Sequence, residues 1–106
     1  MKWIKIFNSP AEAEQALNKR NPIRLQLGEK SFCLTFFEGR YYVTDNACPH
    51  QKESLSGGTI NYLGEVICPL HFYRFSVKTG RECQGRTADL TTYPTKMDDS
   101  GFHVYV

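Results

Sequence analysis

Two short cysteine–histidine motifs constrain this chain more than any other feature of its sequence. One reads C-P-H at positions 48–50, the other reads C-P-L-H at positions 68–71, and seventeen residues separate them. Thiolates and imidazoles are the ligands that soft and borderline metals select, and each proline fixes φ within a tight turn. The spacing therefore predicts a metal centre held by two loops, with four candidate ligands: Cys48, His50, Cys68 and His71.

The order of the ligands indicates the kind of metal centre. Each motif offers one cysteine and one histidine, whereas common zinc modules pair like ligands with like. The mixed order matches a 2Fe–2S cluster in which two cysteines bind one iron and two histidines bind the other. Two other interpretations stay open, namely a structural zinc site on the same residues and buried thiols beside unrelated surface histidines. Zinc would give a colourless protein, and the cluster a red-brown one.

With these motifs the sequence resembles the Rieske family, whose signature is C-x-H, a gap of this length, and then C-x-x-H. The likeness extends to Asn46, Leu55, Gly58 and the segment 74–80, and it covers roughly residues 23–106. The resemblance implies that the four candidate ligands bind one Rieske-type 2Fe–2S cluster.

An all-β fold is expected from the resemblance and from the hydrophobic periodicity. The resemblance implies one Rieske domain over residues 1–106, with antiparallel sheets in a sandwich or barrel-like arrangement. A small cluster-binding subdomain is expected as an insertion at about residues 46–85, where the periodicity breaks down. Outside that insertion, alternating apolar and polar residues predict strands at 2–7, 23–27, 32–36, 41–43, 90–97 and 102–106.

One short helix is predicted near the N-terminus. Ser9 can cap it, Pro10 suits the first helical position, and Glu12 falls where it would close a capping box. An apolar stripe that includes Leu17 would face the core, and Asn21-Pro22 would end the helix.

The composition limits the class of protein. A chain of 106 residues fits one domain, and 41% hydrophobic residues are enough for a packed core. The net charge of +2 is too small for a nucleic-acid binder, and no apolar run reaches the roughly 20 residues that cross a bilayer. The N-terminus also lacks the apolar stretch of a signal peptide. We therefore expect a cytoplasmic protein that binds neither nucleic acid nor membranes.

Several positions depart from the high-potential members of the family. Those proteins carry a disulfide between the two loops, and Glu53 and Leu70 occupy the corresponding positions here. They also place two hydroxyl donors near the cluster, where this chain has Tyr73 and Phe75, and a glycine where it has Phe72. Donors to cluster sulfur stabilise the reduced state, so their loss predicts a potential at the low end of the Rieske range, about −150 mV.

The remaining cysteines and a basic segment are not part of this signature. Cys33 lies in a predicted strand and Cys83 in a loop, and both are expected to be inert thiols. Residues 83–86 stand where many relatives carry a proline-rich loop that shields the cluster. Residues 72–86 hold four basic side chains against one acidic side chain, which would steer an acidic redox partner if the segment lies near the cluster.

An electron carrier, rather than an enzyme, is the function that the resemblance implies. The sequence has no nucleophile elbow, no phosphate-binding glycine loop and no nicotinamide fingerprint. We expect a Rieske-type ferredoxin that takes single electrons from a reductase and passes them to an oxygenase or a similar terminal enzyme. One alternative is the Rieske-like small subunit of an assimilatory nitrite reductase. A structural zinc-binding adaptor is a further alternative.

Overall fold

Three antiparallel sheets and one short helix make up the fold. The computed structural model describes residues 1–18 and 20–106. The sheets have the strand orders β1-β10-β9, β2-β3-β4-β8 and β5-β6-β7. This arrangement confirms the predicted all-β class with a single N-terminal helix. The elements are β1 (Trp3–Phe7), α1 (Pro10–Asn18), β2 (Ile23–Leu27), β3 (Lys30–Phe37), β4 (Arg40–Asp45), the 3₁₀ turn η1 (Leu55–Gly57), β5 (Thr59–Ile60), β6 (Glu65–Ile67), β7 (Arg74–Ser76), β8 (Thr92–Tyr93), β9 (Thr95–Asp98) and β10 (Gly101–Tyr105).

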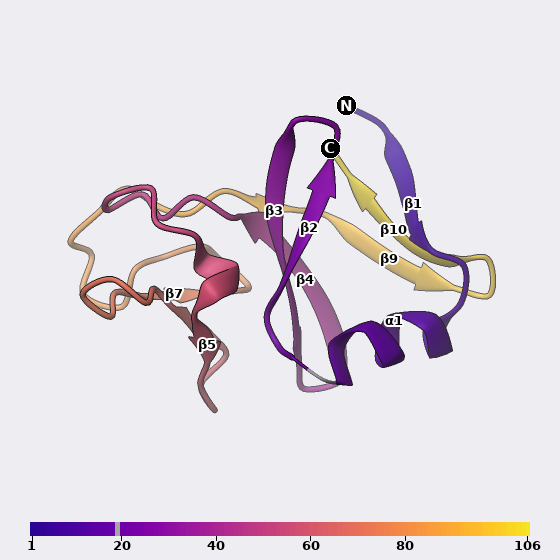
Figure 1. Ribbon diagram of the computed structural model, residues 1–106, viewed down its shortest axis with the longest axis horizontal. Helices are drawn as coiled ribbons and strands as arrows, with labels where there is room; N and C mark the ends of the chain where they lie inside the picture. The colour runs from indigo at the N-terminus through magenta and orange to yellow at the C-terminus, as the bar shows by residue number, and fades with distance from the viewer. Residues whose placement is uncertain (19) are drawn as a thin grey trace.

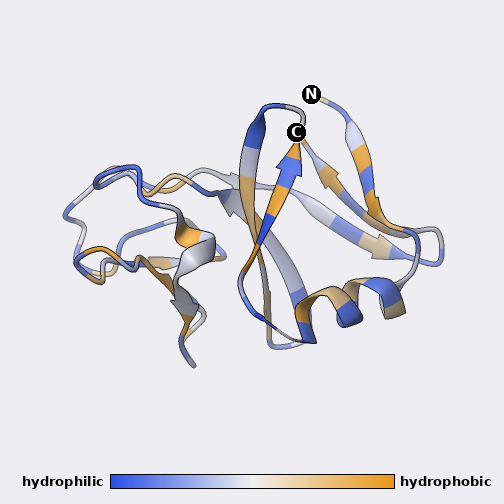
Figure 2. Cartoon of the chain, viewed as in Figure 1, coloured by the Kyte–Doolittle hydropathy of each residue, from blue (hydrophilic) through white to orange (hydrophobic). Residues whose placement is uncertain are grey.

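Strands β2, β3 and β4 form a meander with the two tight turns that the sequence predicts. The first turn has Gly28 at φ 63°, and the second has Glu38 at φ 50° and Gly39 at φ 81°. Positive φ in two-residue loops matches the right-handed twist of the flanking strands, so these turns place neighbouring strands in register. The alternation of apolar and polar residues along β2 is visible in Figure 2.

Strand β3 differs from the predicted one-sided stripe because it is buried on both sides. Phe32 and Leu34 belong to the core between the first two sheets, whereas Cys33 belongs to a second core that contains Cys48 and Cys68. Phe36, which continues the predicted stripe, is 39% exposed. Strand β3 therefore separates the two cores and connects the main sheets to the candidate metal centre.

Helix α1 begins as the sequence predicts. The Glu12 backbone N–H donates to Ser9 Oγ at 3.2 Å, which satisfies one of the free amides of the first turn. The Glu12 side chain does not close the capping box, because its carboxylate accepts from Asn8 Nδ2 at 3.5 Å. Ala13 and Leu17 are buried and pack the helix onto the sheets. The described helix spans Pro10–Asn18, and residues 20–22 are not helical, in agreement with the predicted stop at Asn21-Pro22.

The two chain termini lie together on the main-sheet half of the molecule, away from the cysteine–histidine motifs (Figure 1). The Lys2 N–H donates to the Val106 carbonyl at 2.7 Å, and the Val106 N–H donates back at 3.1 Å. The loops between β4 and β5 and between β6 and β7, which carry the motifs, extend away from the main sheets to one end of the molecule (Figure 1). In the described part of the chain, no helix is both long enough and apolar enough to cross a membrane.

Candidate metal centre

The two motifs form loops of the same construction, which we call the first finger (residues 48–53) and the second finger (residues 68–73). The Cys48 N–H donates to the Glu53 carbonyl at 2.9 Å, and the Cys68 N–H donates to the Tyr73 carbonyl at 2.8 Å. Each finger therefore closes onto the residue five positions after its cysteine. A left-handed residue precedes each closing residue, with Lys52 at φ 62° and Phe72 at φ 60°. The two cysteines consequently occupy equivalent positions at the bases of two matching loops.

The fingers bring the four predicted ligands together as an inner pair and an outer pair. Cys48 and Cys68 are both 0% exposed and belong to the same apolar cluster. His71 is exposed and His50 is half-buried. The two imidazole centroids are 5.2 Å apart, with their planes at 60°. Sulfur donors thus lie inside and nitrogen donors outside, which is the arrangement that an asymmetrically ligated two-iron cluster requires.

The chemistry of these donors fits such a cluster. Burial raises the pKa of the Cys68 thiol to about 11, and the neighbouring Cys48 thiol contributes to the rise, so two thiolates here need a bound cation. His50 Nδ1 is buried and finds no hydrogen-bond partner among the described residues, which leaves its lone pair available to a metal, and the same holds for His103 Nδ1 far from the fingers. Within residues 1–18 and 20–106, no three His, Cys, Asp or Glu side chains converge on a point that could hold a single metal ion.

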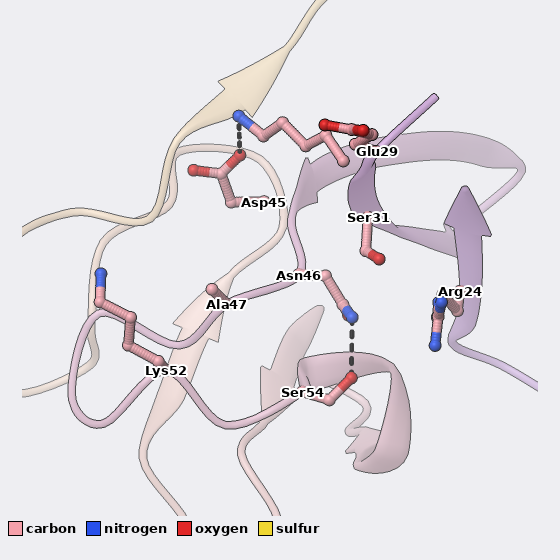
Figure 3. Close-up of a pocket in the computed structure, with 9 residues that line it drawn as sticks. Arg24, Glu29, Ser31, Asp45, Asn46, Ala47, Lys52 and Ser54 are labelled. Atoms are coloured by element: carbon pink, nitrogen blue, oxygen red, sulfur yellow. Dashed lines mark hydrogen bonds and ion pairs between the residues drawn. The ribbon is translucent and has the colours of Figure 1, made fainter. Parts of the chain in front are cut away.

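Asn46 fixes the base of the first finger to the 3₁₀ turn η1. Its Nδ2 donates to Ser54 Oγ at 2.7 Å, as Figure 3 shows, and its Oδ1 accepts from the Ser56 N–H at 2.8 Å. The Asn46 carbonyl accepts from the Leu55 N–H at 2.8 Å. Leu55 is 0% exposed in the same core as the cysteines. Asn46 and Leu55, which the resemblance singled out, are therefore structural supports of the finger.

Close packing against the second finger explains Gly58. A Cβ at this position would collide with the carbonyl oxygen of Ile67 and would lie 3.2 Å from Pro69 Cδ. Glycine is therefore required for η1 to approach the start of the second finger.

Tyr73 and Phe75 pack in or against the core that contains the cysteines, at the positions where the high-potential members carry hydroxyl donors. Phe75 is 0% exposed in the core beneath the fingers and carries no polar atom. The ring of Tyr73 lies flat against His50. The centroids of these two rings are 4.0 Å apart, and their planes are inclined by 12°.

An ion pair that sequence reasoning missed continues this stack. The Arg86 guanidinium lies 3.9 Å from the Tyr73 ring centroid, on the segment expected in place of the proline-rich loop. Arg86 Nε and Nη2 donate to the two carboxylate oxygens of Glu82 at 3.1 and 2.9 Å. Hydrogen bonds from Arg86 hold the pKa of the Glu82 carboxyl well below its usual range, although Glu82 is 0% exposed. Glu82 and Arg86 are four residues apart, which is the spacing of an ion pair on a helix. The sequence predicts no helix in this segment, so the spacing did not indicate a contact.

The charge excess of the segment 72–86 is mostly compensated by residues distant in the sequence. Arg74 Nη1 lies 3.5 Å from Glu65, and Lys78 Nζ lies 3.9 Å from Glu38. With the Glu82–Arg86 pair, three of the four basic side chains are thus matched by acidic ones. The basic patch predicted from the segment alone is therefore reduced to a net excess of about one charge, which lowers its capacity to steer a partner.

The other two cysteines form no disulfide. Cys33 is buried, and burial raises the pKa of its thiol to about 12, which agrees with an inert thiol. Cys83 is exposed, and its Sγ donates to Glu82 Oε2 at 3.2 Å. The expectation of an inert thiol at Cys83 therefore has no support from burial.

Comparisons with known proteins identify the family of this chain. A family model described as the Rieske [2Fe-2S] domain matches residues 8–94. The ferredoxin component of a 2,4-dinitrotoluene dioxygenase system from Burkholderia sp. (strain RASC) is 39% identical over 98 residues, covering 92% of this chain and 88% of that protein.

Solved structures share the fold. The ferredoxin of carbazole 1,9a-dioxygenase from Nocardioides aromaticivorans IC177 matches with a TM-score of 0.77 and 19% identity, covering 98% of this chain and 97% of that one. A chain in the complex of reduced oxygenase and oxidized ferredoxin in carbazole 1,9a-dioxygenase matches with a TM-score of 0.78 and 22% identity, covering 96% of this chain and 91% of that one. The family model and the sequence relative together show that this chain belongs to the Rieske [2Fe-2S] domain family.

Proposed function

We propose that this protein is a one-electron carrier that takes electrons from a reductase and delivers them to an oxygenase. The observation that carries the proposal is the pairing of two buried thiols with two outer imidazoles at one end of the molecule. The relative from Burkholderia is itself named a ferredoxin component of a dioxygenase system, which favours a separate carrier over a nitrite reductase subunit. A similar chain occurs in a solved oxygenase–ferredoxin complex, which supports an oxygenase as the acceptor.

We propose that all four residues bind the cluster, and that the two cysteines have a different role from the two histidines. A 2Fe–2S cluster, when bound, takes up and releases one electron within the potential range that mixed ligation sets. Cys48 and Cys68 would anchor it from the apolar core, where water is excluded. His50 and His71 would bind it from the outer side. Because His71 is exposed, its ring offers electrons a short path to a partner surface.

Residues of about 46–85 are proposed to act as the cluster-binding subdomain of a single domain over residues 1–106. Both fingers and the small sheet β5-β6-β7 lie within this range. A cytoplasmic location is proposed as well, because free thiols at Cys33 and Cys83 suit a reducing compartment.

Metal analysis with histidine variants tests the site. The purified protein is expected to be red-brown, with about two irons and two sulfides per chain. His50→Ala and His71→Ala should each lose the cluster spectrum, since each removes an outer ligand. His103→Ala is the matched control, because His103 lies in β10, opposite Lys5 and Lys96 and away from both fingers. Zinc without iron or sulfide, or an unchanged cluster in His50→Ala, would contradict the proposed site.

Reductive titration tests the proposed role. The protein should accept one electron per chain, and the reduced form should be reoxidised by a Rieske oxygenase. Copurification as a tight complex with a larger nitrite-reducing subunit would instead support the subunit alternative.

A further inference from the structure

The two histidines of the candidate centre have different surroundings. Among the described residues, the only aromatic neighbour of His71 is the edge-on ring of His50. His50 also has the Tyr73 ring stacked flat on it, 4.0 Å away and inclined by 12°. One imidazole is therefore covered on a face, and the other is exposed.

The cover on His50 is itself held in place from its far side. The Arg86 guanidinium packs on the Tyr73 ring with its central carbon 3.9 Å from the centroid. A cation over an aromatic face is attracted by the quadrupole of the ring, and the attraction grows when water is excluded. Tyr73 is thus sandwiched between the imidazole of His50 and the guanidinium of Arg86.

Glu82 fixes the guanidinium in the plane that this sandwich needs. Its carboxylate, 0% exposed, accepts from Arg86 Nε, from Arg86 Nη2 and from the Arg86 backbone N–H at 2.8 Å. The Glu82 backbone is held by a β-bridge to Phe75 of β7, and a left-handed Gly85 at φ 68° turns the chain back toward it. A series of contacts therefore links β7 through Glu82, Arg86 and Tyr73 to His50.

We propose that Arg86, oriented by Glu82, is a positioning residue that clamps Tyr73 against His50 and thereby fixes the orientation of that imidazole. The inference rests on the proposed function, because it treats His50 as a cluster ligand. The clamp covers one face of His50 and restricts rotation of its ring. Its loss should free the ring, alter the environment of the histidine nitrogen and let the cluster escape more easily.

Variants of Tyr73 separate stacking from the hydroxyl group. Tyr73→Phe keeps the ring and removes a hydroxyl that has no partner among the described residues, so it should behave as the unmodified protein. Tyr73→Leu removes the aromatic face. Its cluster should be lost to a chelator roughly three- to tenfold faster, in keeping with the strength of a partly buried cation–π contact. The histidine nitrogen couplings in the electron-spin spectrum of the reduced protein should also change.

Variants of Arg86 separate planarity from charge. Arg86→Lys keeps a positive charge beside Glu82 but lacks the flat, two-pronged group, so it should follow Tyr73→Leu in both measurements. The double variant Glu82→Gln with Arg86→Gln avoids a buried unpaired carboxylate and should do the same. Arg81→Gln removes an exposed arginine five residues away in the chain and is the matched control, for which no change is expected.

The outcomes distinguish this inference from the proposed function. The clamp would be overturned if Arg86→Lys and Tyr73→Leu gave the same rate of cluster loss to a chelator and the same nitrogen couplings as Tyr73→Phe. The proposed cluster site would not be affected by that result. An equal change in Arg81→Gln would also overturn it, because a general charge effect would then explain the result. An unmodified protein without iron and sulfide would instead overturn the proposed function.

Discussion

At the scale of single residues, the ligands could be predicted from the sequence and their surroundings could not. Cys48, His50, Cys68 and His71 form local motifs whose spacing already points to one centre. The contact between Arg86 and Tyr73 joins two separate loops, the second finger and the segment after β7, and no local pattern encodes how those loops pack together. Local motifs are readable because neighbouring residues share one loop, whereas contacts between loops are set by packing.

Phe72 is held in a conformation that suits glycine. Its φ is 60° and its side chain is 71% exposed, so the ring contributes little packing to offset the strain. A left-handed backbone costs an L-residue about 1–2 kcal/mol, which glycine would avoid. Glycine loses more conformational freedom on folding, and this entropy cost cancels part of the advantage. We expect Phe72→Gly to be more stable than Phe72→Ala by about 1 kcal/mol in urea unfolding. Equal midpoints for the two variants would show that residue 72 carries no strain.

The buried carboxylate of Glu82 makes stability depend on acid. Arg86 holds the pKa of the folded Glu82 carboxyl below its ordinary value of 4.5, so the contribution of Glu82 is complete above that pH. As the pH falls below 4.5, the unfolded chain binds a proton that the folded chain still excludes, and stability is lost. The difference in melting temperature between the unmodified protein and Glu82→Gln should be measured between pH 7 and pH 3.5. It should be constant at the higher pH values and narrow only as the pH falls below 4.5. A constant gap would contradict a lowered pKa.

The reduction potential is a third property set by individual residues. Phe75 carries no hydroxyl, so one of the two donors that raise the potential in the high-potential members of the family is absent here. Protein-film or dye-mediated titration near neutral pH should give about −150 mV, the lower limit of Rieske centres. A potential well above zero would mean that other donors reach the cluster.

At the scale of elements, the strands and their turns followed from alternation, while the change of sheet within one predicted strand did not. Residues 28–29 and 38–39 form the predicted turns because their local chemistry decides the conformation. The predicted strand at 90–97 is divided at Pro94 into β8 and β9, which belong to different sheets. Proline removes the amide that a continuous ladder would need, and the chain changes sheets at that point.

The contact of η1 with the second finger gives a matched pair of variants. Gly58→Ala would force a methyl group against the Ile67 carbonyl, whereas the same change at Gly57 meets only Pro69 Cγ at 4.0 Å. We expect Gly58→Ala to destabilise the protein by about 1–3 kcal/mol and to lower its iron content, because overpacking displaces the second finger. Gly57→Ala should change neither quantity appreciably. Similar effects in both variants would show that helix propensity, and not this contact, governs the turn.

At the scale of the whole molecule, charge is distributed more evenly than the sequence of one segment indicates. The acidic partners of Arg74 and Lys78 come from β6 and from the turn after β3, which folding brings to the same side. Segment-by-segment counting could not show this, because it omits residues that are distant in the chain.

Weak electrostatic steering is the measurable result of this compensation. Reduced protein can be oxidised by anionic ferricyanide and by cationic hexaammineruthenium(III) over a range of ionic strength. With a net charge of +2 and most basic groups paired, both rates should vary only modestly with salt and in opposite directions. A steep decrease with salt for ferricyanide alone would reveal an uncompensated basic surface around the fingers.

The hydrogen-bonded ends of the chain have a practical consequence. Lys2 and Val106 pair just beyond the ends of β1 and β10, on the main-sheet half of the molecule and away from both fingers (Figure 1). A tether attached to either end would therefore leave the fingers clear of the point of attachment. Immobilised in this way on a conducting support, the protein would present its outer histidines to the medium, ready to serve as a wired mediator for a dissolved oxygenase.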